Sequence, residues 1–172
     1  AVLAHNADLG VIFDTDVDRS ALVDKQGKTL NRNNLIGIIS AIVIKENPGT
    51  TIVTNSTTSE HLKNFIESLG GKQNRYITGY RNVINRAIQL NKDGIPTSLA
   101  IETSGHAALK ENYFLDDGAY LVAKILMTDA VLTKEGKELS SLITNLKQPV
   151  ETDEVRFKIL SEDISLVGAD AM

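Results

Sequence analysis

The sequence predicts an α/β protein, with a three-layer α/β/α unit built on a mixed sheet and flanked by incomplete pieces of neighbouring domains. Short β-branched runs at residues 9–13, 51–54 and 98–101 alternate with longer stretches of helical period. This alternation is typical of strands covered by helices. The 172 residues are 42% hydrophobic and carry a net charge of −4, as in an ordinary globular protein.

The composition excludes several classes of protein. The chain has no cysteine, which excludes a disulfide scaffold and a thiolate metal site. Lysine and arginine are scattered singly and acidic residues outnumber them, so we expect no nucleic-acid partner. No apolar run approaches the roughly 20 residues that span a bilayer, and residues 1–10 lack the pattern of a signal peptide. We therefore expect no membrane partner and a cytoplasmic location.

The first expected elements are a short helix-like tail at residues 1–7 and the strand at 9–13. Residues 33–46 carry apolar side chains nearly all round, which predicts a helix that is covered on most sides. Pro48 and Gly49 end this helix, because proline and glycine break the helical pattern.

The next helix has clear start and stop signals. Residues 57–60, Thr-Thr-Ser-Glu, fit a capping box, and the glycine pair at 70–71 supplies the stop. Its apolar stripe consists of Leu62, Phe65, Ile66 and Leu69. Further helices are expected over residues 81–91 and over residues 117–132, with Asp117 as the N-cap.

The two ends of the chain do not resemble complete domains. Residues 31–132 contain all the elements of one three-layer unit, whereas the strand within residues 1–30 would need sheet neighbours elsewhere. Residues 133–172 begin with an amphipathic helix and end with an alternating strand at 154–159, after a Gln-Pro linker. We therefore expect a piece of a longer protein, with parts at 1–30, 31–132 and 133–172.

An acidic loop follows the first strand directly. Asp14, Asp16 and Asp18 place three carboxylates at the carboxyl end of an apolar strand, where ligands bind in α/β proteins. Hard oxygen donors at alternate positions suit Mg²⁺ or Ca²⁺. The alternative is a solvated turn between two strands, but three acids beside a single cation, Arg19, favour a metal site.

Two known acidic loops can be compared with this one. An EF-hand loop that starts at Asp14 would need glycine at Arg19 and glutamate at Lys25, so that interpretation fails. The nucleophile loop of haloacid-dehalogenase-like phosphatases also has Asp-x-Asp after an apolar strand, and the pair at 116–117 could be its second acidic pair. A phosphatase would also need a lysine at a matching strand end, and none is evident. This interpretation stays as an alternative.

A second polar loop follows the strand at 98–101. Glu102, Ser104 and His106 lie together on a turn, and Gly105 allows close approach of a ligand. A carboxylate and a hydroxyl so arranged suit hydrogen bonds to vicinal sugar hydroxyls. A lone histidine after a strand is usually structural, but the cluster as a whole indicates a binding site.

Together, the Asp-x-Asp-x-Asp-Arg loop at 14–19, the Glu-x-Ser-Gly-His loop at 102–106 and the Asp-Asp-Gly at 116–118 resemble the α-D-phosphohexomutases, the phosphoglucomutase/phosphomannomutase superfamily. The resemblance covers essentially the whole chain. Members have four domains, so it implies that residues 1–30 end the second domain, 31–132 form the third and 133–172 begin the fourth.

The resemblance also implies roles for the residues of the acidic loop. Asp14, Asp16 and Asp18 match the aspartates that bind Mg²⁺ together with a phosphoserine from the first domain. Arg19 matches an arginine close to the transferring phosphoryl group. The family usually has glycine between these aspartates, whereas Thr15 and Val17 stand here. A β-branched residue would be strained if either position needs a positive φ.

The second loop matches the family's sugar-binding residues. Glu102 and Ser104 match the groups that contact sugar hydroxyls, and His106 matches a histidine with a proton-transfer role. Gly79-Tyr80-Arg81 resembles a Gly-aromatic-Lys turn that contributes a cation to the active cleft, with Arg81 in place of lysine.

The implied reaction is interconversion of a hexose 1-phosphate and a hexose 6-phosphate, of glucose or mannose, through a phosphoserine and a bisphosphorylated sugar. The family's Ser-His-Asn-Pro phosphoserine motif is absent from this sequence, so we expect the chain to be inactive without the remaining domains of its parent. Besides the phosphatase, a non-catalytic sugar- or metal-binding α/β module stays as an alternative.

Overall fold

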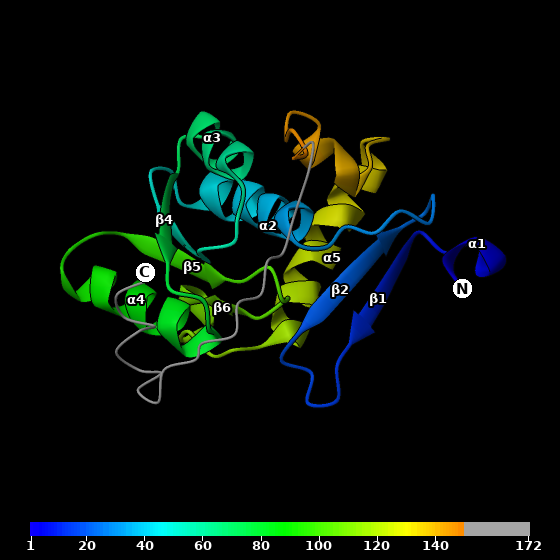
Figure 1. The fold of residues 1–172 in the computed structure, drawn as a ribbon. Helices are drawn as coiled ribbons and strands as arrows, with labels where there is room; N and C mark the ends of the chain where they lie inside the picture. The colour runs from blue at the N-terminus through cyan, green and yellow to red at the C-terminus, as the bar shows by residue number, and fades with distance from the viewer. Residues whose placement is uncertain (150–172) are drawn as a thin grey trace.

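A computed structural model describes residues 1–149, and the strands in this part of the chain form two sheets (Figure 1). An antiparallel hairpin pairs β1 (Leu9–Phe13) with β2 (Ser20–Asp24). A second sheet has the order β4-β3-β5-β6, and its strands are β3 (Thr51–Asn55), β4 (Lys72–Tyr76), β5 (Thr97–Ile101) and β6 (Ala107–Leu109). The strands β3, β4 and β5 are parallel, and β6 is antiparallel to β5. The expected mixed sheet is therefore confirmed.

Helices cover both faces of the larger sheet (Figure 1). The helices are α1 (Val2–His5), α2 (Asn33–Glu46), α3 (Glu60–Ser68), α4 (Tyr80–Lys92) and α5 (Gly118–Lys134), with 3-10 helices η1 (Lys110–Asn112) and η2 (Leu139–Ile143). The helices α2, α3 and α5 contribute to one hydrophobic core and α4 to another. This arrangement confirms the expected three layers.

Alternate side chains of β3 point into the two cores, because successive residues of a strand face opposite sides of the sheet. Ile52 lies in the larger core with Ile36 of α2, and Val53 lies in the smaller core with Val83 of α4. All of these side chains are almost fully buried. The helix α2 has nine buried residues, which confirms that it is covered on most sides.

Three local expectations were wrong. The strand at 9–13 was expected to find its sheet neighbours elsewhere, but it pairs with β2 within residues 1–30. The N-cap of α3 is Ser59, whose Oγ accepts a hydrogen bond from the Leu62 backbone N–H at 3.1 Å. A capping box needs glutamate at the third helical position; Glu60 is instead the first helical residue and pairs with Arg75 at 2.6 Å. The expected amphipathic helix after residue 132 is the short 3-10 helix η2, which follows a turn at Gly136 with φ of 69°.

The hairpin and the larger unit are in contact. The helix α5 contacts both hairpin strands as well as β6, and it lies between the hairpin and the larger sheet (Figure 1). Beyond Lys134, Leu139 and Leu146 are buried in the same core as α2. The strand expected at 154–159 lies outside the described residues. Within residues 1–149, no helix is both long and apolar enough to cross a membrane.

Candidate active site

The acidic loop joins the two antiparallel strands of the hairpin, so it has the geometry of a turn between strands. It nevertheless gathers the three predicted carboxylates: Asp14, Asp16 and Asp18 each offer an oxygen, and these atoms lie within 4.8 Å of one another. The side chains of Asp14 and Asp18 are only 21% and 28% exposed. Asp16 is exposed. Three carboxylates at this spacing, two of them partly desolvated, repel one another unless a cation lies between them.

Arg19 supplies part of that positive charge. Its backbone N–H donates to Asp14 Oδ1 at 3.1 Å, and its guanidinium Nε donates to Asp14 Oδ2 at 2.7 Å. Desolvation acts to raise the pKa of Asp14, but these two contacts outweigh it and hold that pKa at about 2. Asp14 is therefore ionised throughout the physiological pH range.

Val17 has a positive φ of 64°, in the left-handed region. Its carbonyl accepts a hydrogen bond at 3.1 Å from the backbone N–H of Gly118, the first residue of α5. A Cβ on Gly118 would lie 2.9 Å from that same oxygen. The strain expected for a β-branched residue in this loop is thus found at Val17, while Thr15 does not have a positive φ.

The two predicted loops meet through their backbones. Arg19 and His106 form an isolated antiparallel β-bridge, and the Ser20 N–H donates to the Gly105 carbonyl at 3.4 Å. Gly105 has φ of +102°, and a Cβ there would lie 2.6 Å from the Ser20 oxygen. Glycine is therefore required at this contact for both its conformation and its size.

Asp116 holds the imidazole of His106. His106 Nδ1 lies 2.8 Å from Asp116 Oδ2 and 3.8 Å from Asp18 Oδ2. Burial raises the pKa of Asp116; the charge and hydrogen bond of His106 oppose the shift, and the Asp18 carboxylate adds to it. An ionised carboxylate can only accept, so Nδ1 carries the proton and Nε2 is the atom of the neutral ring that can accept one. The sequence motifs did not predict this role of Asp116, because its partner His106 lies ten residues earlier in the chain, just before β6.

Glu102 is more buried than its predicted contact with sugar hydroxyls suggested. It is 4% exposed, and its Oε1 accepts a hydrogen bond from the Gly79 backbone N–H at 2.6 Å. Ser104, which is exposed, donates from Oγ to Glu102 Oε2 at 3.4 Å. The base of the loop is fixed by Asn55, whose Oδ1 accepts from the Thr103 N–H at 3.1 Å. The structure thus brings Glu102 and Ser104 together, with Oε2 as the less tightly held oxygen.

Arg81 lies beside Tyr80, the first residue of α4. Its Nε donates to the Tyr80 hydroxyl at 3.0 Å. The Tyr80 ring stacks on His106, with ring centroids 5.0 Å apart and an interplanar angle of 19°. The Gly-Tyr-Arg motif includes Tyr80, but the sequence alone did not predict this contact with His106.

The donor set fits a hard divalent cation. The three loop carboxylates supply only oxygen, which is what Mg²⁺ and Ca²⁺ prefer. Asp18 Oδ1 is buried and has no hydrogen-bond partner among residues 1–149, and the Arg19 Nε lies 3.8 Å from it, beyond hydrogen-bond distance. A buried oxygen of this kind needs a partner such as an ion or water.

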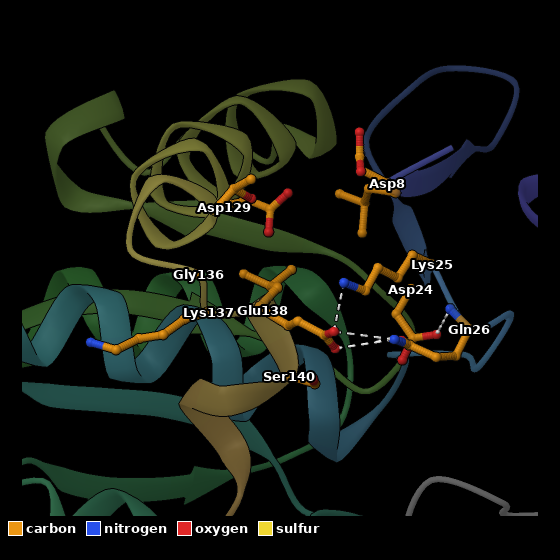
Figure 2. A pocket seen from close by; sticks show the side chains of 12 residues that line it. Asp8, Asp24, Lys25, Gln26, Asp129, Gly136, Lys137, Glu138 and Ser140 are labelled. Atoms are coloured by element: carbon orange, nitrogen blue, oxygen red, sulfur yellow. Dashed lines mark hydrogen bonds and ion pairs between the residues drawn. The ribbon is translucent and has the colours of Figure 1, made fainter. Parts of the chain in front are cut away.

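A different pocket lies at the other end of the hairpin (Figure 2). It is lined by Asp8, Lys25, Asp129 and Glu138 among others, and it contains none of the predicted site residues. Lys25 pairs with Glu138 at 2.6 Å across this pocket, which ties the hairpin to the segment after α5. This pocket is separate from the two loops that carry the candidate chemistry.

Comparisons with known proteins identify the same family as the two loops. Residues 31–150 match the family model of the phosphoglucomutase/phosphomannomutase α/β/α domain III. A phosphomannomutase/phosphoglucomutase of Pseudomonas syringae pv. tomato is 31% identical over 154 residues, which are 89% of this chain and 31% of the relative. A phosphoglucosamine mutase of Geotalea daltonii is 30% identical over 146 residues, which are 83% of this chain and 30% of that protein.

A solved structure agrees. A phosphoglucomutase/phosphomannomutase family protein from Burkholderia thailandensis superposes with a TM-score of 0.74 at 29% identity, over 88% of this chain and 31% of that one. The chain thus spans about a third of the length of the relatives it matches. These matches decide against the haloacid-dehalogenase-like interpretation. The chain belongs to the phosphoglucomutase/phosphomannomutase family.

Proposed function

We propose that this chain is the part of a phosphohexomutase that carries two loops of the active site: the acidic loop at residues 14–19, which would hold a metal ion, and the loop at residues 102–106, here called the sugar loop. The parent protein would interconvert hexose 1-phosphate and hexose 6-phosphate in the cytoplasm. The observation that carries the proposal is the backbone bridge between Arg19 and His106, which joins the two loops in a chain of this family. The sugar of the substrate is glucose, mannose or an amino sugar, since relatives are named as mutases of each of these sugar phosphates.

Asp14, Asp16 and Asp18 would hold a Mg²⁺ ion. When bound, Mg²⁺ supplies positive charge near the transferring phosphoryl group, where phosphoryl transfer needs it. Arg19 contributes a fixed charge at the same end of the hairpin, because Asp14 holds its guanidinium. Three carboxylates leave the coordination shell incomplete, so we expect weak Mg²⁺ binding by this chain unless a phosphoserine of the parent completes the site.

The sugar loop has two tasks in this proposal. Glu102 Oε2 and Ser104 Oγ would accept and donate hydrogen bonds to sugar hydroxyls, which orients the sugar in either direction. His106 would exchange a proton with the reacting hydroxyl through Nε2, since Asp116 holds the proton on Nδ1. Arg81 would contact a phosphate group of the substrate, for which a guanidinium is well suited.

The test uses the parent protein with hexose 1-phosphate, Mg²⁺ and a bisphosphate activator. We expect conversion to the 6-phosphate, and we expect this chain alone to show none. Glu102→Gln should reduce kcat/KM about ten- to a hundred-fold, because a hydrogen bond to a charged group is worth roughly 1.5–3 kcal/mol. Asp16→Asn should slow formation of the phosphoenzyme itself.

Glu67→Gln is the matched control, since Glu67 is exposed on α3. It should leave kcat/KM unchanged. A parent protein that releases inorganic phosphate without forming the 6-phosphate would contradict the mutase proposal. If Glu102→Gln keeps normal kcat/KM while Asp16→Asn loses activity, the sugar-contact assignment alone would be wrong.

A further inference from the structure

The turn before α4 contacts other parts of the site through separate bonds. Thr78 Oγ1 lies 3.0 Å from Ser56 Oγ, just after the end of β3. The Gly79 N–H donates to Glu102 at 2.6 Å. Because Gly79 has φ of 126°, the chain turns sharply here and α4 begins at the next residue. The turn is therefore held both at Thr78 and at Gly79.

Tyr80 follows Gly79 and contacts two candidate site residues at once. Its ring stacks on the His106 imidazole at a centroid distance of 5.0 Å. Its hydroxyl accepts a hydrogen bond from Arg81 Nε at 3.0 Å, and the Arg81 guanidinium carbon lies 5.6 Å from the ring centroid. Tyr80 itself is 36% exposed, so its contacts with the site, rather than burial in a core, account for its orientation.

The two contacts have different consequences. Asp116 fixes one edge of the His106 ring through Nδ1, but a single hydrogen bond leaves the ring free to tilt about it. A stacked aromatic neighbour removes that freedom, because it favours one parallel arrangement of the rings. The hydroxyl bond acts on Arg81 instead, whose long side chain otherwise samples many rotamers.

We propose that Tyr80 is a positioning residue of the mutase reaction, with its ring fixing the plane of His106 and its hydroxyl holding Arg81. The inference rests on the proposed function. It also separates the two parts of Tyr80: the ring supports the chemical step through His106, and the hydroxyl supports substrate binding through Arg81.

The test compares Tyr80→Phe with Tyr80→Leu in the parent protein. Tyr80→Phe keeps the stacked ring and loses the bond to Arg81, so KM should rise about three- to ten-fold with kcat within two-fold of wild type. Tyr80→Leu loses both contacts, so kcat should also fall about ten-fold. A kcat that is low in Tyr80→Leu but close to wild type in Tyr80→Phe would show that the stacked ring supports the chemical step.

Tyr76→Leu provides a matched control. Tyr76 also has an arginine over its ring, Arg86 at 5.3 Å, but the ring that stacks on His106 is that of Tyr80. Tyr76→Leu should leave kcat and KM unchanged.

A second readout needs no activity. In this chain, proton NMR at fixed pH should show the His106 ring signals shifted by the Tyr80 ring, with the shift kept in Tyr80→Phe and lost in Tyr80→Leu. Unchanged His106 signals in Tyr80→Leu would overturn the inference. So would a leucine variant with wild-type kcat in an active parent. A parent without mutase activity would overturn the proposed function instead, and with it the catalytic part of this inference.

Discussion

The backbones of Arg19 and His106 pair through a β-bridge, so the acidic loop and the sugar loop are held in one fixed relationship. Two further bonds support this pairing: Ser20 N–H to the Gly105 carbonyl, and Gly118 N–H to the Val17 carbonyl. The hairpin and the three-layer unit therefore share one functional edge, and its stability depends on the residues that allow this close approach.

Gly105→Ala should destabilise the chain by about 3 kcal/mol, since the new methyl group would lie 2.6 Å from the Ser20 carbonyl and φ is +102°. Gly94→Ala is the control, because Gly94 has φ of +79° but a methyl group there would meet no atom within 4 Å. It should lose only about 1 kcal/mol from backbone strain. Urea unfolding measures both values. Equal losses would show that the contact between the loops is not tight.

Val17→Gly should stabilise the chain by up to about 1 kcal/mol. Glycine adopts a φ of 64° without strain, which outweighs its greater freedom in the unfolded chain, and the side chain of Val17 is 39% exposed. Thr15→Gly, two residues away and without a positive φ, should lose stability instead. Denaturant unfolding distinguishes the two variants, and a destabilised Val17→Gly would contradict the strain argument.

Asp129 lines the pocket shown in Figure 2. Asp129→Asn should stabilise the chain at neutral pH. Burial, and after it the charge of Asp8, raises the pKa of Asp129, while Lys25 opposes the shift. Since the folded chain holds this proton more tightly than the unfolded one, the ionised carboxylate costs stability as pH rises above the unfolded pKa of about 4. The gain should stay within about 1 kcal/mol because the group is only partly buried.

Unfolding of wild type and Asp129→Asn between pH 3 and pH 8 checks this prediction. The difference should vanish below about pH 4, where both side chains are neutral. Asp93→Asn, at an exposed carboxylate after α4, serves as the comparison. A gain that is the same at every pH would point to a cause other than the charge of Asp129.

Arg19→Gln should raise the pKa of Asp14 above its value of about 2, because the variant loses the guanidinium charge and its hydrogen bond but keeps the backbone N–H that donates to Asp14 Oδ1. The Asp14–Arg19 pair has a depressed carboxyl pKa, so its stabilisation is present above about pH 4 and is lost as pH falls toward 2. A carbon-13 NMR titration of the Asp14 carboxyl, in a buffer that contains a chelator to remove divalent cations, measures the midpoint of its protonation. Arg86→Gln, a change on α4, should leave that midpoint where it is.

Much of the fold could be predicted because it depends on local patterns. The all-round apolar residues of 33–46 predicted α2 with the bounds that the structure has, and Asp117 caps α5 through its bond to the Tyr120 N–H at 2.8 Å. The strand β1 also has its predicted bounds. By contrast, β4 has the polar sequence Lys-Gln-Asn-Arg-Tyr and lies at the end of the described sheet, so hydrophobic pattern gave no signal for it.

The sequence by itself determined which chemical groups the two loops carry, because Asp-x-Asp-x-Asp-Arg and Glu-x-Ser-Gly-His are contiguous motifs. Only the tertiary structure decided how these groups are held. Asp116 meets His106 because the chain after β6 folds back beside that strand, where Asp116 forms an antiparallel bridge with Ala108. Glu102 meets Gly79 because the carboxyl ends of the parallel strands β4 and β5 lie at the same edge of the sheet. Such contacts join residues that are separated in the sequence, so no local sequence pattern predicts them.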